Sequence, residues 1–132
     1  MLVAAAITPR GVCGRLLNAA LDGQWKVVAS ALLFSELGEV LGRRKLRRWL
    51  SEEEARQFVD GVRDLAEMLA DPPAPSVNET PDPKDEFLIA LARAAKVMAL
   101  VSGDPHLTDL VDSEPPVLTP AAFLGRLHSA RP

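Results

Sequence analysis

The chain has 132 residues, of which 48% are hydrophobic, and a formal net charge of −3 at pH 7. The hydrophobic content excludes a disordered chain, and the length predicts a single domain over residues 1–132. The slightly negative charge excludes nucleic-acid binding through an overall basic field, so such binding would need a local basic patch or metal ions.

The cysteine content and the N-terminal segment bear on the cellular compartment. Cys13 is the single cysteine and cannot form an internal disulfide, which favours the reducing cytoplasm. Residues 1–7 are apolar but too few to cross a membrane, and no basic leader precedes them. We therefore expect a cytoplasmic protein with no membrane partner.

The N-terminal part of the chain predicts a helix, a strand and a second helix. The helices are expected over residues 12–21 and 31–41, with Ser30 as the cap of the second, and a buried strand over residues 25–29. Glu36 borders the apolar face of the second helix, where a carboxylate must find a partner, shift its pKa or bind a metal. The residues alone support a metal site and a salt bridge to an arginine equally.

A basic run follows this helix and ends at Trp49. It consists of Arg43, Arg44, Lys45, Arg47 and Arg48. Such a run could bind RNA phosphates while the indole stacks on a base. The pattern alone favours the alternative, a solvated turn between helices.

The middle of the chain predicts one amphipathic helix. Ser51 and Glu54 form a capping box, and an apolar stripe then runs as far as Leu69. A stripe of this kind is typical of a core face or of a surface that a partner covers. The prolines of residues 72–75 end the helix, and a short strand is expected over residues 76–78.

The stretch from Asp82 to Asp104 predicts a helix followed by a buried strand. Asp82 is the expected cap, and residues 97–101 the expected strand. The apolar stripe of this helix is expected at Phe87, Ala90, Leu91 and Ala94. Because chemistry in open parallel sheets lies at the carboxyl ends of strands, Asp104 and Asp85 are candidate site residues. Helix capping is the alternative role for both carboxylates, with Asp104 as the cap of residues 105–110. A last strand over 117–118 and a helix capped by Thr119 close the chain.

Three segments of this sequence resemble the PIN domain family, the nuclease fold of toxins in VapBC-type toxin–antitoxin pairs. The segment from Ser30 to Leu41 is similar to the family's glutamate-bearing helix. The segment from Asp85 to Leu107 is similar to its Ala-rich helix, apolar strand and Ser-x-Asp ending. The closing strand, Thr119-Pro120 and final helix also resemble the family's end. The resemblance covers nearly the whole chain.

The resemblance implies a PIN-like α/β/α sandwich around a parallel sheet and a metal-dependent endoribonuclease that acts as a toxin. Glu36, Asp85 and Asp104 would be its catalytic and metal-binding residues, and Ser102 a supporting hydroxyl. Mg²⁺ or Mn²⁺ suits these ligands, because hard cations prefer oxygen atoms and activate phosphodiesters. The implied partners are an RNA substrate, a cognate antitoxin and a second copy of the chain in a homodimer.

One part of the family pattern is missing. Family members begin with a central strand that ends in Asp-Thr-Asn-Val, whereas residues 1–7 resemble only the helix after it. We therefore expect a fold that lacks the first central strand, and a full gene product that carries this strand upstream of Met1. The 132-residue form is expected to be poorly stable and nearly inactive. The alternative function is a catalytically inactive PIN-like module that only binds a partner.

Overall fold

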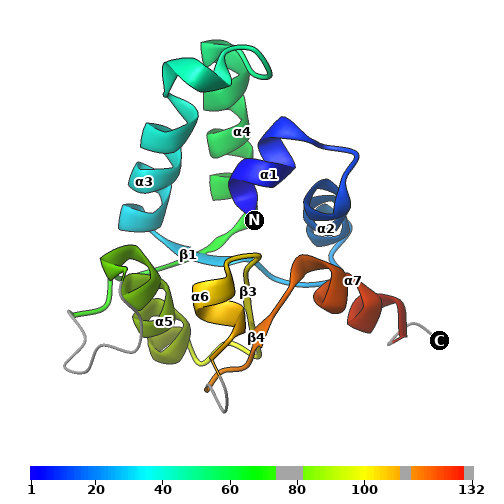
Figure 1. Cartoon of the computed structure of the whole chain (residues 1–132), viewed down its shortest axis with the longest axis vertical. Helices are drawn as coiled ribbons and strands as arrows, with labels where there is room; N and C mark the ends of the chain where they lie inside the picture. The colour runs from blue at the N-terminus through cyan, green and yellow to red at the C-terminus, as the bar shows by residue number, and fades with distance from the viewer. Residues whose placement is uncertain (74–81, 111–113, 130–132) are drawn as a thin grey trace. The chain divides into compact units, whose positions relative to one another are not determined.

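The computed structural model describes residues 1–73, 82–110 and 114–129. These residues belong to two compact units, Met1–Ala70 and Asp71–Pro132, which are described separately below. Each unit combines helices with one pair of short parallel strands (Figure 1), so the mixed α/β class expected from the sequence is confirmed, and these elements are consistent with a PIN-like α/β/α fold. Among the described residues, none of the helices combines the length and the hydrophobicity that crossing a membrane requires.

Unit 1 contains a helical layer beside a two-stranded sheet (Figure 1). Its helices are α1 (Leu2–Ile7), α2 (Val12–Leu21), α3 (Ala31–Leu41) and α4 (Glu52–Leu65), with a 3₁₀ helix, η1, at Arg44–Leu46. Its strands are β1 (Val28–Ser30) and β2 (Glu67–Leu69), which pair in parallel with Ala29 opposite Met68. The predicted bounds of α2 and α3 are confirmed, as is the Ser30 cap, whose hydroxyl accepts a hydrogen bond from the Leu33 N–H at 3.4 Å.

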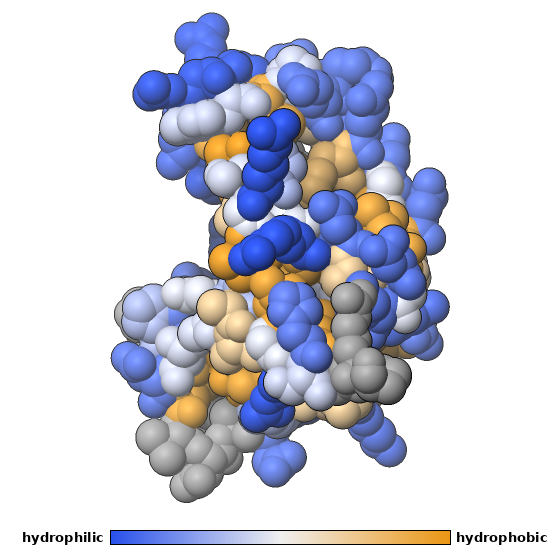
Figure 2. All heavy atoms as spheres, turned by 90° about the vertical axis from the view of Figure 1, so that its right-hand side faces the viewer, coloured by the Kyte–Doolittle hydropathy of each residue, from blue (hydrophilic) through white to orange (hydrophobic). Residues whose placement is uncertain are grey.

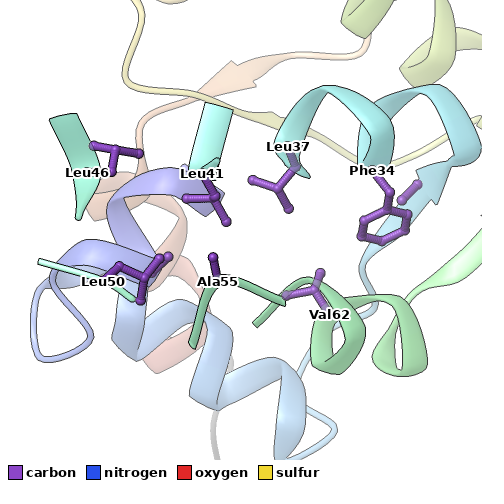
Figure 3. Close-up of a cluster of buried hydrophobic side chains, with 9 residues drawn as sticks. Phe34, Leu37, Leu41, Leu46, Leu50, Ala55 and Val62 are labelled. Atoms are coloured by element: carbon purple, nitrogen blue, oxygen red, sulfur yellow. The ribbon is translucent and has the colours of Figure 1, made fainter. Parts of the chain in front are cut away.

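The core of unit 1 lies where α3 faces α4. Phe34, Leu37 and Leu41 project from α3 toward Ala55 and Val62 of α4 (Figure 3). Leu46 and Leu50 close this core at the connection between the two helices. The apolar stripe of α4 is thus largely a core face, as one of the two sequence interpretations held.

Residues 67–69 correct the prediction of one helix running as far as Leu69. The helix ends at Leu65, and Ala66 adopts an extended conformation. The Glu67 N–H then donates to the Val27 carbonyl at 2.8 Å, which begins β2. Parallel pairing with β1 therefore prevails over a local pattern that still has helical periodicity. The same pairing places β1 at 28–30, slightly later than the predicted 25–29.

The described residues of unit 2 form three helices and the second pair of strands. The helices are α5 (Pro83–Ala95), α6 (Pro105–Thr108) and α7 (Pro120–Ser129), and the strands are β3 (Leu100–Val101) and β4 (Val117–Leu118). The two strands pair in parallel, with Leu100 opposite Val117. The predicted last strand and the Thr119 cap of the last helix are confirmed, because the Thr119 hydroxyl accepts from the Ala122 N–H at 3.1 Å. The strand expected over residues 76–78 lies outside the described residues.

The strand predicted over residues 97–101 is shorter than expected. Lys96 ends α5 in the left-handed conformation, with φ of 54°, and the Val97 N–H still bonds the Ala92 carbonyl. Lys96 and Val97 therefore belong to the C-terminal cap of α5, and Met98 is 92% exposed instead of buried. An apolar run alone does not show where a helix cap ends and a strand begins.

The buried face of α5 also differs from the predicted stripe. Of the predicted stripe, Leu91 is buried, whereas Ala94 is exposed. Asp85, Ile89 and Ala92 are also buried, at the i, i+4, i+7 spacing of one helix face. The sequence from residue 87 to 92 is apolar throughout, so it does not define one face. As a consequence, a carboxylate occupies the core-facing side of the helix.

Candidate active site

Glu36 lies on α3 in unit 1, between the buried residues Phe34 and Leu37. Its side chain is half-buried, in agreement with a position at the border of the apolar face. Glu39, one turn further along, is exposed. Within the described part of the chain, no arginine forms an ion pair with Glu36. The salt-bridge alternative therefore finds no support there.

Asp85 lies in the first turn of α5 and is only 6% exposed. The helix begins at Asp82, whose carboxylate accepts a hydrogen bond from the Lys84 N–H at 2.9 Å, so the predicted capping role of Asp82 is confirmed. Asp82 is thus the N-cap, and Asp85 is the third residue of the helix.

Glu86 is a buried acid that the sequence-based selection of site residues missed. It is 6% exposed, as is its neighbour Asp85. Burial of two adjacent acids is unusual, because ionised groups are rarely buried unless they are paired or bind a metal. The predicted apolar stripe did not include this side of the helix, so it did not predict that Glu86 is buried.

Asp104 follows β3 directly and precedes α6. Its side chain is half-buried, and its backbone carbonyl accepts from the N–H groups of Leu107 and Thr108, at 3.0 and 2.9 Å. The Ser102 hydroxyl accepts a hydrogen bond from the Asp104 N–H at 3.0 Å. Ser102 therefore holds the turn that carries Asp104, which gives it a defined structural role near this acid.

The structure places Asp85 and Asp104 in unit 2, on a helix and after a strand that pack against each other through α5 and β3. Glu36 belongs to unit 1. In the described ranges, no group of three or more histidine, cysteine, aspartate or glutamate side chains has the arrangement of a metal site. Convergence of Glu36, Asp85 and Asp104 on one ion remains a prediction.

The basic run lies between α3 and α4. Four of its members have exposed side chains, namely Arg43, Arg44, Lys45 and Arg48. Arg47 differs, because its guanidinium is half-buried and donates through Nη2 to the Leu41 carbonyl at the end of α3. Arg47 thus has a structural contact that the other four lack.

A comparison with protein-family models shows the family of this chain. The family model described as PIN domain matches residues 1–106. The chain belongs to the PIN domain family. No curated protein and no solved structure matches it significantly. As a PIN domain, the chain has a nuclease-like fold.

Membership of the PIN domain family indicates which ligand the candidate acids would bind. PIN domains generally use divalent metal ions. The matched range includes Glu36, Asp85 and Asp104. Their carboxylate oxygens are the donors that Mg²⁺ and Mn²⁺ prefer, and Mg²⁺ needs only one or two of them directly. The donor chemistry of these residues therefore fits a divalent cation.

Proposed function

We propose that this PIN domain is a metal-dependent endoribonuclease that hydrolyses phosphodiester bonds of RNA and acts as the toxin of a toxin–antitoxin pair in the cytoplasm. The observation that carries the proposal is the burial of Asp85 on the core-facing side of α5, at 6% exposure, in a chain of this family. A strongly buried carboxylate is a candidate for a functional role.

Glu36, Asp85 and Asp104 are the residues that would hold Mg²⁺ or Mn²⁺. When bound, such an ion polarises the phosphodiester, lowers the pKa of an attacking water and stabilises the leaving oxygen. Without it, clustered carboxylates repel the phosphates of an RNA chain, which makes activity depend on the cation.

The roles of individual residues follow from their positions. Asp85 is oriented by the first turn of α5, since Asp82 fixes where that helix begins. Asp104 is oriented by the Ser102 hydroxyl on one side and by the first turn of α6 on the other. We therefore assign metal binding to the acids and positioning of Asp104 to Ser102.

An antitoxin and a second copy of the chain are the proposed protein partners. Several apolar side chains of the described residues are exposed, including Leu21 at 63% and Met98 at 92%. An antitoxin segment or a homodimer would remove such surface from water. Analytical ultracentrifugation of the purified chain, alone and with the product of an adjacent gene, tests both; a monomer that binds neither would contradict this assignment.

Strands β1 and β3 each have one edge at which an added strand would pair. The Val27 carbonyl bonds to β2, so the alternating backbone turns the N–H and C=O of Val28 to the opposite edge. Leu100 and Ser102 both donate to residues of the β4 segment, so Val101 likewise points away from it. In the described residues, no strand pairs with either of these edges.

The second candidate function is a catalytically inactive PIN-like module that only binds a partner. Its support is that Glu36 belongs to unit 1 whereas Asp85 and Asp104 belong to unit 2, and that no group of three such side chains among the described residues has the arrangement of a metal site. Addition of an N-terminal strand ending in Asp-Thr-Asn separates the candidates. The nuclease proposal expects the extended protein to be more stable and to cleave structured RNA with Mn²⁺ but not with EDTA. An extended protein that binds Mn²⁺ no better and leaves the RNA intact favours the inactive module.

A further inference from the structure

Side chains that point into unit 1 hold the connection between α3 and α4 in place. Leu46 and Leu50 are each 6% exposed and belong to the core of unit 1. Arg47 bonds the Leu41 carbonyl, and η1 adds a hydrogen-bonded turn between these contacts. Three inward-facing side chains therefore hold the connection in one shape, which reduces the entropy that a ligand would have to remove on binding.

The outward side of this connection is basic. Arg43, Arg44, Lys45 and Arg48 are all exposed there, and we call these four residues the basic connection. Five of the chain's 15 lysine and arginine residues lie within residues 43–48. The rest of the sequence therefore has 10 basic residues and all 18 acidic residues. Figure 2 shows strongly hydrophilic side chains gathered at the end of unit 1 where α3 passes into α4. Positive charge is thus concentrated in a chain that is negative overall.

Acidic side chains at the start of α4 lie next in sequence but are engaged locally. Glu53 pairs with Arg56 at 3.6 Å, and Glu54 accepts a hydrogen bond from the Ser51 N–H at 3.0 Å. Two of the three glutamates at residues 52–54 therefore interact with residues in the first turns of their own helix. By contrast, the four arginine and lysine side chains of the basic connection form no ion pair within the described residues.

Trp49 supplies an aromatic surface beside these charges. The side chain is 51% exposed, and the Arg48 guanidinium carbon lies 4.7 Å from the centroid of its ring. Tryptophan side chains are usually largely buried, because their burial stabilises the fold. The exposure of Trp49 therefore favours a role in binding. An exposed indole with a stacked guanidinium is the combination that accepts an unpaired base, because both groups present planar faces.

We propose that the basic connection and Trp49 form an RNA-binding surface for a single-stranded segment. The four cationic side chains bind phosphates, and the indole stacks on one base. The choice of RNA rests on the proposed nuclease function, whereas the polyanion-binding chemistry rests on this surface alone. An acidic protein segment would satisfy the charges but would leave the indole without a stacking partner, so the structure favours RNA.

The test measures binding without cleavage. The probe is a short fluorescein-labelled oligouridylate with 2′-O-methyl groups, titrated with the full chain in EDTA and followed by anisotropy at several salt concentrations. The absence of divalent metal separates this surface from the proposed catalytic acids. A wild-type chain that does not bind the probe would therefore overturn this inference, whereas a failure to cleave unmodified RNA in the separate Mn²⁺ assay would count against the proposed function.

Charge substitutions give the first result. Replacing all four residues of the basic connection by Gln is expected to abolish measurable binding at moderate salt. Single replacements should lower the slope of log Kd against log salt by ~0.7 for each phosphate contact removed. The matched control removes four exposed charges elsewhere in the chain, through the substitutions Arg10→Gln, Arg15→Gln, Lys26→Gln and Arg126→Gln. Equal weakening by the control would show a non-specific charge effect and overturn the proposal.

Substitutions of the indole give the second result. Trp49→Ala should weaken binding roughly 5- to 150-fold, the range for loss of one stacked base, and Trp49→Phe should recover part of it. In a Trp25→Phe background, RNA should also quench the fluorescence of Trp49. An unchanged Kd in Trp49→Ala, together with equally strong competition by polyglutamate, would show a surface for acidic proteins and contradict RNA binding.

Discussion

The Ser102 hydroxyl and the Asp104 backbone N–H are joined by a hydrogen bond of 3.0 Å, at the point where β3 ends. This contact fixes the two residues before Pro105, which opens α6. It connects a sequence feature, Ser-x-Asp after an apolar strand, to a defined turn. The orientation of Asp104 therefore depends on a neighbouring hydroxyl as well as on the sheet.

Replacement of Ser102 tests this positioning role. Ser102→Ala removes the acceptor of the Asp104 N–H, and we expect a loss of ~1 kcal/mol in the free energy of unfolding, typical of one hydrogen bond. Affinity for Mn²⁺ should fall as well, while Ser102→Thr, which keeps the hydroxyl, should retain both. Urea unfolding and Mn²⁺ titration by electron paramagnetic resonance measure the two effects. Wild-type Mn²⁺ affinity in Ser102→Ala would contradict a positioning role.

The core of unit 1 gives a prediction about stability. Phe34 is 1% exposed between α3 and α4, so Phe34→Ala should lower the free energy of unfolding by ~3–5 kcal/mol through lost burial and a cavity. Leu32 on the same helix is 42% exposed, and Leu32→Ala is the control, with a change of less than ~1 kcal/mol. Similar losses in both variants by urea denaturation would contradict the arrangement in Figure 3.

The capping box of α4 gives a prediction about pH. Hydrogen bonds from the backbone N–H and the hydroxyl of Ser51 lower the pKa of Glu54 below 4.5, its ordinary value. A carboxylate with a lowered pKa in the folded state stabilises the fold above its unfolded pKa and loses this effect as the pH falls through the folded value. Glu54→Gln should therefore be destabilising at pH 7, and the difference from wild type should shrink below pH ~4.5. The measurement is the urea midpoint of both proteins across this range; a difference independent of pH would argue against the capping box.

Helices in this chain were predictable because their end signals are local. Ser30, Ser51, Asp82 and Thr119 each accept a hydrogen bond from a backbone N–H in the first turn of the helix that they begin. The strands were less predictable because they form through pairing of distant segments. Glu67 to Leu69 carry no strand pattern of their own and become β2 only beside Val28 to Ser30.

The candidate site was predictable in part. The resemblance implied Glu36, Asp85 and Asp104 as site residues, and their role stays a prediction. The structure places Glu36 in unit 1 and the two aspartates in unit 2, with Asp85 on the buried face of α5. The local pattern did not predict that face, because Phe87 to Ala92 are apolar all around the helix. The burial of Glu86 was missed for the same reason. Contacts between residues far apart in sequence decide which carboxylate is buried, and hydrophobic periodicity does not contain that information.

The central claim is that carboxylates of this PIN domain hold a divalent cation that drives RNA cleavage. Its most direct measurement is cleavage of structured RNA in Mn²⁺ by the extended protein described above and by its Asp85→Asn variant, with Asp82→Asn as the matched control. Asn keeps the size of Asp and can still cap a helix, so both variants are expected to fold. The account predicts that Asp85→Asn loses at least about 100-fold in rate and loses Mn²⁺ binding, an effect of the size that loss of a catalytic interaction produces. It predicts that Asp82→Asn stays close to wild type. Full activity of Asp85→Asn, or equal losses in both variants, would contradict it.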